Sequence, residues 1–174
     1  MQASLDSVLL NGKRIQLHDE LPVIGTTAED FTFVKPDLSE DSFYDIEGVR
    51  VILALPSLDT GTCSKMTRMF NEELSKREGV TGIVVSKDLP FAMRRFCETN
   101  GIKNIVAASD YRYNEFTEEY NIKMLEGALK GLIARAVLVV DKKGKIRYTE
   151  LVEDVVNEPD YQAALEAVDK LLAS

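Results

Sequence analysis

Residues 51–74 read VILALPSLDTGTCSKMTRMFNEEL, and within them an apolar run passes into a helical pattern. The run Val51–Leu55 is apolar at every position, which is typical of a strand buried on both faces, and Pro56 ends it. From about Thr62 to Arg77 the apolar side chains recur at the spacing of one helix face: Met66, Met69, Phe70 and Leu74. The stretch predicts a buried strand followed by an amphipathic helix, with Cys63 in the first helical turn.

The same order repeats on the C-terminal side of this stretch. Gly79 is expected to close the first helix, and Thr81–Ser86 is a second apolar run typical of an interior strand. A second helix from about Leu89 stops at Asn100-Gly101, and the apolar run Asn104–Ala108 follows it. Strands that alternate with helices in this way indicate a parallel sheet with right-handed crossovers.

Two hairpins are predicted outside this region. At the start of the chain, Val8–Leu10 and Arg14–Leu17 flank Asn11-Gly12, a dipeptide that supports a type I′ turn. We expect this hairpin to cap the main sheet. Near the C-terminus, Ala136–Val140 and Lys145–Tyr148 flank a link of four residues, which suits an antiparallel pair.

A last helix is predicted after Pro159, with an apolar face made by Tyr161, Ala164, Leu165, Val168 and Leu172. Parallel strands, then an antiparallel hairpin and then a closing helix indicate an α/β sandwich of the thioredoxin type. The 174 residues fit one ordinary domain, and no repeat or linker divides residues 1–174. We expect a single domain.

The composition is that of a globular protein without affinity for polyanions. Hydrophobic residues make up 45% of the chain, charged residues 29%, and the formal net charge is -8. Non-specific binding to nucleic acid or to an anionic membrane needs a basic surface, so we expect neither partner. No run approaches the ~18 apolar residues of a membrane span, and the N-terminus lacks the features of a secretory signal. We therefore expect a cytoplasmic protein.

The chain has two cysteines, Cys63 and Cys97, and one histidine, His18. Two thiols are too few for the disulfide framework of a small secreted domain, so they serve either redox chemistry or core packing. A structural zinc site usually takes four Cys or His ligands at short spacings, which this set does not supply. We expect no metal and assign His18 no catalytic role.

Cys63 has the position of a reactive thiol. Only the thiolate is a good nucleophile, and the free N–H groups and dipole at a helix N-terminus favour negative charge. Residues 56–62 connect the carboxyl end of a buried strand to that helix, which is where open α/β sheets place their sites. Thr60 in this loop offers a hydroxyl to the thiolate or to a bound substrate oxygen.

The spacing Pro56-xxx-Thr60-xx-Cys63 resembles the PxxxTxxC active-site motif of peroxiredoxins. The surrounding residues 57–64 are similar, more narrowly, to the bacterial thiol peroxidase subfamily. The resemblance extends through the N-terminal hairpin, the second cysteine and the segment Ala134–Asp141, so it covers nearly the whole chain. It implies a thioredoxin-like fold of the peroxiredoxin type with an N-terminal β-hairpin.

The resemblance also implies roles for individual residues. Cys63 would attack the O–O bond of a hydroperoxide and become a sulfenic acid, and Cys97 would condense with it to an intramolecular disulfide. Arg135 matches the arginine that lies beside the attacking thiolate in that family, where it would hold the thiolate and donate to the peroxide oxygens. Thr60 would hold the peroxide in line. The family further implies reduction by thioredoxin, a homodimer and no bound cofactor.

The second predicted helix adds a hypothesis about this cycle. Its apolar face holds Leu89, Ala92, Met93, Phe96 and Cys97. A disulfide needs Cα atoms within about 7 Å of each other, and two helix positions separated by a strand are unlikely to start that close. We therefore expect the turn around Cys97 to unwind in each cycle.

Two other functions fit the same cysteines. A thioredoxin-type disulfide oxidoreductase would need Cys-x-x-Cys at the helix start, whereas Met66 stands three places after Cys63. A redox-sensing or partner-binding protein without peroxidase turnover would need both cysteines but not Arg135, which by default would be a surface residue or an ion-pair partner.

Other side chains near the predicted site leave questions open. Asp59 is discordant, because a carboxylate near Cys63 disfavours the thiolate unless it points to solvent or pairs with Lys65 or Arg68. Four aromatic residues would by default pack in the core, and some of them could instead line an apolar mouth around Cys63 that favours organic hydroperoxides: Phe43, Tyr44, Phe91 and Phe96.

Overall fold

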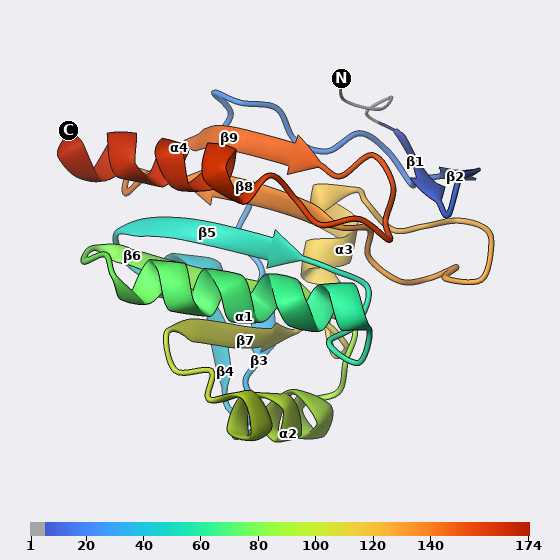
Figure 1. Cartoon of the computed structure of the whole chain (residues 1–174), viewed down its shortest axis with the longest axis horizontal. Coiled ribbons are helices and arrows are strands. Elements are labelled where there is room, and N and C mark those ends of the chain that lie inside the picture. Colours follow the sequence, from blue (N-terminus) through green and yellow to red (C-terminus); the bar gives the residue numbers. More distant parts are fainter. Residues whose placement is uncertain (1–5) are drawn as a thin grey trace.

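The structure is a computed structural model that describes residues 6–174. A seven-stranded sheet runs through the molecule, and helices and loops cover its two faces (Figure 1). In spatial order its strands are β4 Glu40–Ser42, β3 Thr32–Val34, β7 Ile105–Ser109, β6 Val80–Ser86, β5 Val49–Ala54, β8 Ala136–Val140 and β9 Ile146–Leu151. The predicted α/β sandwich is confirmed.

The central strands pair as the sequence predicts. β5 runs parallel to β6, and β6 runs parallel to β7, whereas β8 is antiparallel to β5 and β9 is antiparallel to β8. In register, Ile52 of β5 lies between Ile83 of β6 and Leu138 of β8. All six residues of β5 are buried, because the strand has a neighbour on each edge and a packed layer on each face.

The helices are α1 Gly61–Ser75, α2 Pro90–Asn100, α3 Glu115–Tyr120 and α4 Tyr161–Ala173. Side chains of α1, α2 and α4 join one apolar cluster with Val51 and Leu53 of β5, whereas those of α3 join a second cluster with Ile52 and Ala54. Alternate residues of β5 thus enter opposite cores, and three helices cover one face while α3 lies on the other.

None of the helices in residues 6–174 is long and apolar enough to cross a membrane. The expectation of no secretory signal also concerns residues 1–5, which lie outside the described part.

The N-terminal hairpin forms a separate sheet of two strands, β1 Ser7–Leu10 and β2 Lys13–Gln16. Asn11 and Gly12 have φ of 51° and 86°, which is the backbone that a type I′ turn requires. Val8 and Ile15 are buried in the α3-side cluster, so the hairpin covers part of that core beyond the edge of the main sheet.

Three sequence-based expectations about the helices are wrong. α1 ends at Ser75, not at Gly79, because Arg77 and Lys76 satisfy its last carbonyls; Gly79 instead has φ +83° in the turn before β6. Met69 is 36% exposed, since it lies about 100° around the helix from Phe70, at the edge of the buried stripe. Leu89 is 51% exposed because it is the N-cap of α2 and precedes its buried face.

α3 is an element that the sequence patterns did not indicate. It has six residues, and Asn114 and Asn121 in left-handed backbone conformation flank it. The buried carboxylate of Asp110 accepts hydrogen bonds from the N–H groups of Phe116 and Thr117 and from the Thr117 hydroxyl. A buried side-chain anchor of this kind stabilises a helix too short to show apolar periodicity.

An aromatic cluster fills the core between α3 and the sheet, with Phe31 at its centre. The Phe31 ring lies 5.2–5.9 Å, centroid to centroid, from four other rings: Phe33, Phe43, Phe116 and Tyr120. All five side chains are at most 1% exposed. This cluster holds α3, β3 and the 3₁₀ turn Phe43–Asp45 to one another.

Replacing Phe31 by Ala should destabilise the protein strongly, because it leaves a cavity among four rings. We expect a loss of about 3–5 kcal/mol in the free energy of unfolding, measured by urea denaturation with a reductant present. The matched control is Phe91→Ala, because that ring is 63% exposed. The control should change stability by no more than about 0.5 kcal/mol. Equal losses in both variants would contradict this account of the core.

Candidate active site

Cys63 lies in the first turn of α1, at the carboxyl end of β5, as the sequence predicts. Thr60 is the N-cap of the helix, and its Oγ1 accepts a hydrogen bond from the Cys63 N–H at 3.4 Å. The Thr60 hydroxyl also donates to the Ser57 carbonyl at 3.2 Å. The cap fixes Cys63 at the end of the helix where free N–H groups favour a negative charge.

The Cys63 side chain faces the core. The residue is 0% exposed and belongs to the apolar cluster under α1, together with Leu55, Leu58 and Met66. Pro56 is also buried, where the chain leaves β5. A reagent therefore reaches the sulfur only when neighbouring side chains shift.

Arg135 is buried, with 2% exposure, so its default interpretation as a surface residue is wrong. It stands just before β8, and its Nε donates to the Val155 carbonyl at 3.0 Å. Its Nη1 lies 3.6 Å from the Met66 sulfur, one helical turn beyond Cys63 on the same face of α1. The fold thus brings the guanidinium under the first turns of α1, 72 positions along the chain from Cys63 (135 − 63).

The guanidinium of Arg135 is held mainly through Nε. That nitrogen donates to a backbone carbonyl, whereas the contact of Nη1 is to a thioether sulfur, which is a weak acceptor. A guanidinium held in this way can present its terminal donors to a small polar molecule.

The loop before Cys63 is held by Asp88, a residue that sequence reasoning missed. One oxygen of its carboxylate accepts from the Ser57 hydroxyl at 2.7 Å, and the other accepts from the Leu58 N–H at 2.8 Å and the Ser86 hydroxyl at 2.6 Å. Asp88 follows β6 and precedes α2, so it ties the Cys63 loop to the start of the helix that carries Cys97. The sequence does carry a signal for Asp88, because polar residues directly after a buried strand are typical of a site at the carboxyl end of the sheet.

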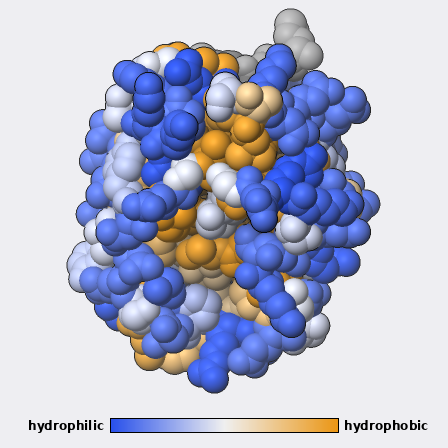
Figure 2. Space-filling view, turned by 90° about the vertical axis from the view of Figure 1, so that its left-hand side faces the viewer, coloured by the Kyte–Doolittle hydropathy of each residue, from blue (hydrophilic) through white to orange (hydrophobic). Residues whose placement is uncertain are grey.

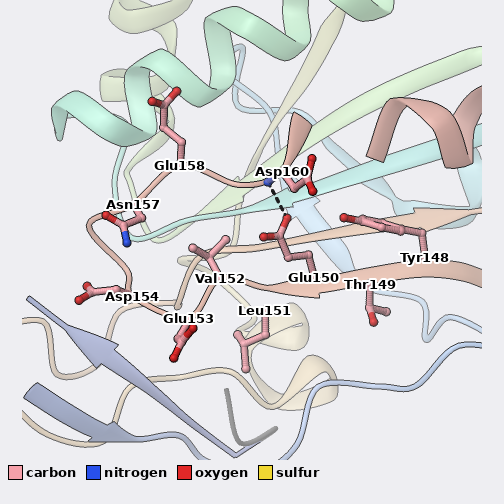
Figure 3. Close-up of a pocket in the computed structure, with 10 residues that line it drawn as sticks. All are labelled: Tyr148, Thr149, Glu150, Leu151, Val152, Glu153, Asp154, Asn157, Glu158 and Asp160. Atoms are coloured by element: carbon pink, nitrogen blue, oxygen red, sulfur yellow. Dashed lines mark hydrogen bonds between the residues drawn. The ribbon is translucent and has the colours of Figure 1, made fainter. Parts of the chain in front are cut away.

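The charged residues near Cys63 do not form the pairs considered from the sequence. Asp59 is exposed, and its carboxylate makes no ion pair within the described chain, so it projects to solvent. Lys65 pairs instead with Glu158 at 3.2 Å. Glu158 lines a surface pocket of about 410 Å³ between β9 and the segment that follows it (Figure 3).

Cys97 lies in the last turn of α2 and is partly exposed. Its backbone carbonyl accepts from the N–H groups of Gly101 and Ile102, which close the helix. Its side chain packs against the same apolar cluster that contains Cys63, and both cysteines are free thiols. Burial, reinforced by the charge of Glu98, raises the pKa of the Cys97 thiol above its ordinary value.

The expected aromatic mouth is only partly present. Phe43 packs with Phe31 in the cluster on the opposite face of the sheet, and the Tyr44 hydroxyl donates to the Ala28 carbonyl there. These two rings lie on the other face of the sheet from the α1 core, so they do not line a mouth around Cys63. Phe96 does belong to the cluster with Cys63, and Phe91 is exposed on α2.

The opposite end of the molecule offers no comparable site. Figure 2 views the end at which β5 and β6 begin, where a hollow band of apolar side chains lies between polar rims. Two surface pockets at the starts of these strands have apolar side chains in their lining, Val49 and Leu171 in one and Val80 and Ile105 in the other. No cysteine lines these pockets. The thiols and the buried guanidinium lie elsewhere.

Comparison with known proteins identifies close relatives. The Redoxin family model matches residues 24–165. The chain is 45% identical over 171 residues to a thiol peroxidase of Leptospira interrogans, covering 97% of this chain and 100% of that protein. The crystal structure of a peroxiredoxin-like protein from Aquifex aeolicus has a TM-score of 0.90 at 40% identity, covering 95% of this chain and 97% of that one. A thiol peroxidase from Chromobacterium violaceum shares the fold, with a TM-score of 0.87 at 19% identity over 94% of this chain and 95% of that one.

Replacing Asp88 by Ala should free the loop before Cys63, because three donors lose their acceptor. We expect a loss of about 2–3 kcal/mol in the free energy of unfolding, measured by urea denaturation of the reduced protein. The control is Asp59→Ala, two positions before α1 begins, where the carboxylate is exposed. If the free energy of unfolding of the control changes by more than about 0.5 kcal/mol, Asp59 has an interaction partner, which contradicts its exposed position.

Proposed function

The chain belongs to the redoxin family and, within it, to the thiol peroxidases, and on this basis we propose that it reduces hydrogen peroxide and organic hydroperoxides through Cys63. The observation that carries the proposal is the position of Cys63 at the α1 N-terminus, with the buried guanidinium of Arg135 one turn away at Met66. Helix N–H groups and a permanent cation both favour a thiolate at this point.

In the proposed first step, the Cys63 thiolate attacks one peroxide oxygen. An S–O bond forms as the O–O bond breaks, and the leaving oxygen takes a proton and departs as water or an alcohol. The sulfur is oxidised to a sulfenic acid, and the peroxide is reduced. Because Cys63 is 0% exposed, neighbouring side chains must shift to admit the substrate.

Three further residues would support this step. Arg135, held through Nε by the Val155 carbonyl, would donate from its terminal nitrogens to the peroxide oxygens as negative charge moves to the leaving group. Thr60, whose hydroxyl already contacts the Cys63 N–H, would hold the peroxide in line. Pro56 would fix the exit of the chain from β5, so that the capped loop keeps its path.

In the second step Cys97 would attack the sulfenic sulfur. An S–S bond forms, the S–O bond breaks, and the oxygen leaves as water. Burial raises the pKa of the Cys97 thiol, so the folded α2 keeps it protonated. Unwinding the last turn of α2 would both expose this thiol and bring it to Cys63, which couples resolution to the opening of the helix.

The cycle would close when thioredoxin reduces the Cys63–Cys97 disulfide by thiol–disulfide exchange. No bound cofactor is needed, because both thiols and the guanidinium belong to the chain. A reducing compartment such as the cytoplasm supplies the dithiol, and the family implies a homodimer. A single domain, residues 1–174, would carry every step.

The test of this proposal is stopped-flow reaction of the reduced protein with cumene hydroperoxide, followed by intact mass. The wild type should react fast and lose two hydrogens, because a disulfide forms. Cys97→Ser should react as fast but stop at the sulfenic acid or its overoxidised products, and Cys63→Ser should show no fast reaction. A wild type that reacts no faster than a free thiol would favour a redox-sensing or partner-binding role instead.

The opening of α2 can be tested at its C-cap. Gly101 has φ +62° with open space around it, so Gly101→Ala strains the left-handed cap and should weaken the last turn by about 1 kcal/mol. That energy corresponds to an increase of about fivefold in the open population, and so in the rate of disulfide formation after oxidation.

The control for this variant is Gly131→Ala, which has φ +93° in open space within a loop away from α2. It carries the same backbone strain and should leave the rate of disulfide formation unchanged. Hydrogen exchange around Cys97 that is equally slow in the reduced and disulfide forms would count against unwinding.

A further inference from the structure

The segment after β9, residues 152–156, contacts the N-terminal hairpin on one side and the candidate active site on the other. We propose that Asp154 is a positioning residue, which uses the hairpin turn to hold the Val155 carbonyl where it aligns Arg135. This inference rests on the proposed function, because it concerns the residue that would bind the peroxide. It gives the hairpin a part in the reaction.

On the hairpin side, Asp154 accepts hydrogen bonds from both residues of the turn. The Asn11 N–H donates to Oδ1 at 2.9 Å, and the Gly12 N–H donates to Oδ2 at 2.8 Å. The left-handed backbone of this turn aims two successive N–H groups at one carboxylate, which is seen beside the hairpin ribbons in Figure 3. Oδ1 also accepts from the Val156 N–H at 3.2 Å.

The backbone of the same segment pairs with β1. The Leu9 N–H donates to the Glu153 carbonyl at 2.8 Å, and the Val155 N–H donates to the Leu9 carbonyl at 2.9 Å. Val155 is buried, at 2% exposure. The hairpin therefore holds two successive residues of this segment. Strand β1 holds the Val155 N–H, and the hairpin turn holds the Asp154 carboxylate.

On the active-site side, the next two carbonyls hold the proposed machinery. The Val155 carbonyl accepts from Arg135 Nε, and the Val156 carbonyl accepts from the Thr62 hydroxyl, each at 3.0 Å. Thr62 is next to Cys63 in the first turn of α1. One short segment thus sets the guanidinium and the start of the helix relative to each other.

A carboxylate suits this position better than an amide of the same size. Its two oxygens are acceptors only, so they can serve all three N–H groups at once, whereas an amide would turn its own donors toward at least one of them. Burial disfavours the charged form, but the N–H groups of Asn11, Gly12 and Val156 outweigh it and hold the pKa of Asp154 below its usual value. The anchor is therefore ionised at neutral pH.

The effect on the reaction follows from geometry. A guanidinium is planar, so the direction of its Nε bond determines where the two terminal nitrogens point. Displacement of a positioning group by about 1 Å can cost about a hundredfold in rate. Loss of the Asp154 anchor should move the Val155 carbonyl, and with it the donors offered to the peroxide, without touching either cysteine.

The experiment compares Asp154→Asn with Glu126→Gln in stopped-flow reaction with cumene hydroperoxide. Glu126 also accepts a hairpin N–H, that of Gln16 at 2.9 Å, but it belongs to the segment before β8 and makes no bond to residues 152–158. Asp154→Asn should lower the second-order peroxide rate by about tenfold to a hundredfold, and Glu126→Gln should keep the wild-type rate. A wild-type rate in Asp154→Asn overturns the inference.

A second readout separates positioning from loosening. Cys63 is fully buried, so a loosened fold should speed its alkylation by iodoacetamide, whereas a misplaced Arg135 should slow only the peroxide reaction. Asp154→Asn is expected to lower the peroxide rate with alkylation no faster than in the wild type. If alkylation accelerates, the role is structural. If Asp154→Asn does not fold, the same two rates are measured for Asp154→Ser, which keeps one acceptor. The same results then support or overturn the inference.

A double-mutant cycle completes the test. Arg135→Lys removes the Nε–H that the Val155 carbonyl holds, so adding Asp154→Asn to it should lower the peroxide rate no further. A full additional loss in the double variant would show that Asp154 acts by another route. If the wild type itself shows no fast reaction with peroxide, the proposed function is wrong. That result can be told apart from a failure of the Asp154 inference, in which the wild type reacts fast and Asp154→Asn reacts equally fast.

Discussion

β5 lies between β6 and β8, with an apolar cluster against each of its faces, and the geometry of the site depends on this burial. A strand packed on all sides cannot shift along its axis, so the point where it ends is fixed in space. Pro56 ends the run, Thr60 caps the next helix, and Cys63 follows in its first turn. The same sheet fixes the start of β8 beside the end of β5, because Ala54 pairs with Ala136, and this brings Arg135 to the site.

The polar groups around the thiol have hydrogen-bond partners from separate parts of the chain. Asp88 serves the loop before Cys63, and the Val155 carbonyl serves Arg135. Because these groups already have partners, they can stay in place in the proposed first step, which would need only the shift of side chains that admits a peroxide to the buried Cys63. The second thiol differs in this respect. Cys97 is held in a helical turn that keeps it half-buried and protonated, and in the proposed cycle it would react once that turn opens.

Local patterns predicted the elements that local forces stabilise. Asn11-Gly12 predicted the hairpin because that turn needs positive φ at both residues, and the continuous apolar run predicted a strand buried on both faces. The same patterns failed at element edges. Met69 and Leu89 were placed on buried faces because periodicity does not show where a face ends. α3 escaped notice because its six residues are too few to show apolar periodicity, and the nearby carboxylate of Asp110 stabilises it.

By itself, the sequence determined the order of strands and helices and the position of Cys63 at a helix start, and its resemblance to a family implies the partnership of that cysteine with Arg135 and Cys97 that we propose. Periodicity, turn chemistry and motif spacing act over a few residues, so they can be read along the chain. Only the tertiary structure decided which groups hold the site in place. Asp154 reaches the hairpin turn across 143 positions, and Arg135 reaches Met66 across 69. Such contacts arise when the sheet brings distant segments together, and no local pattern records them.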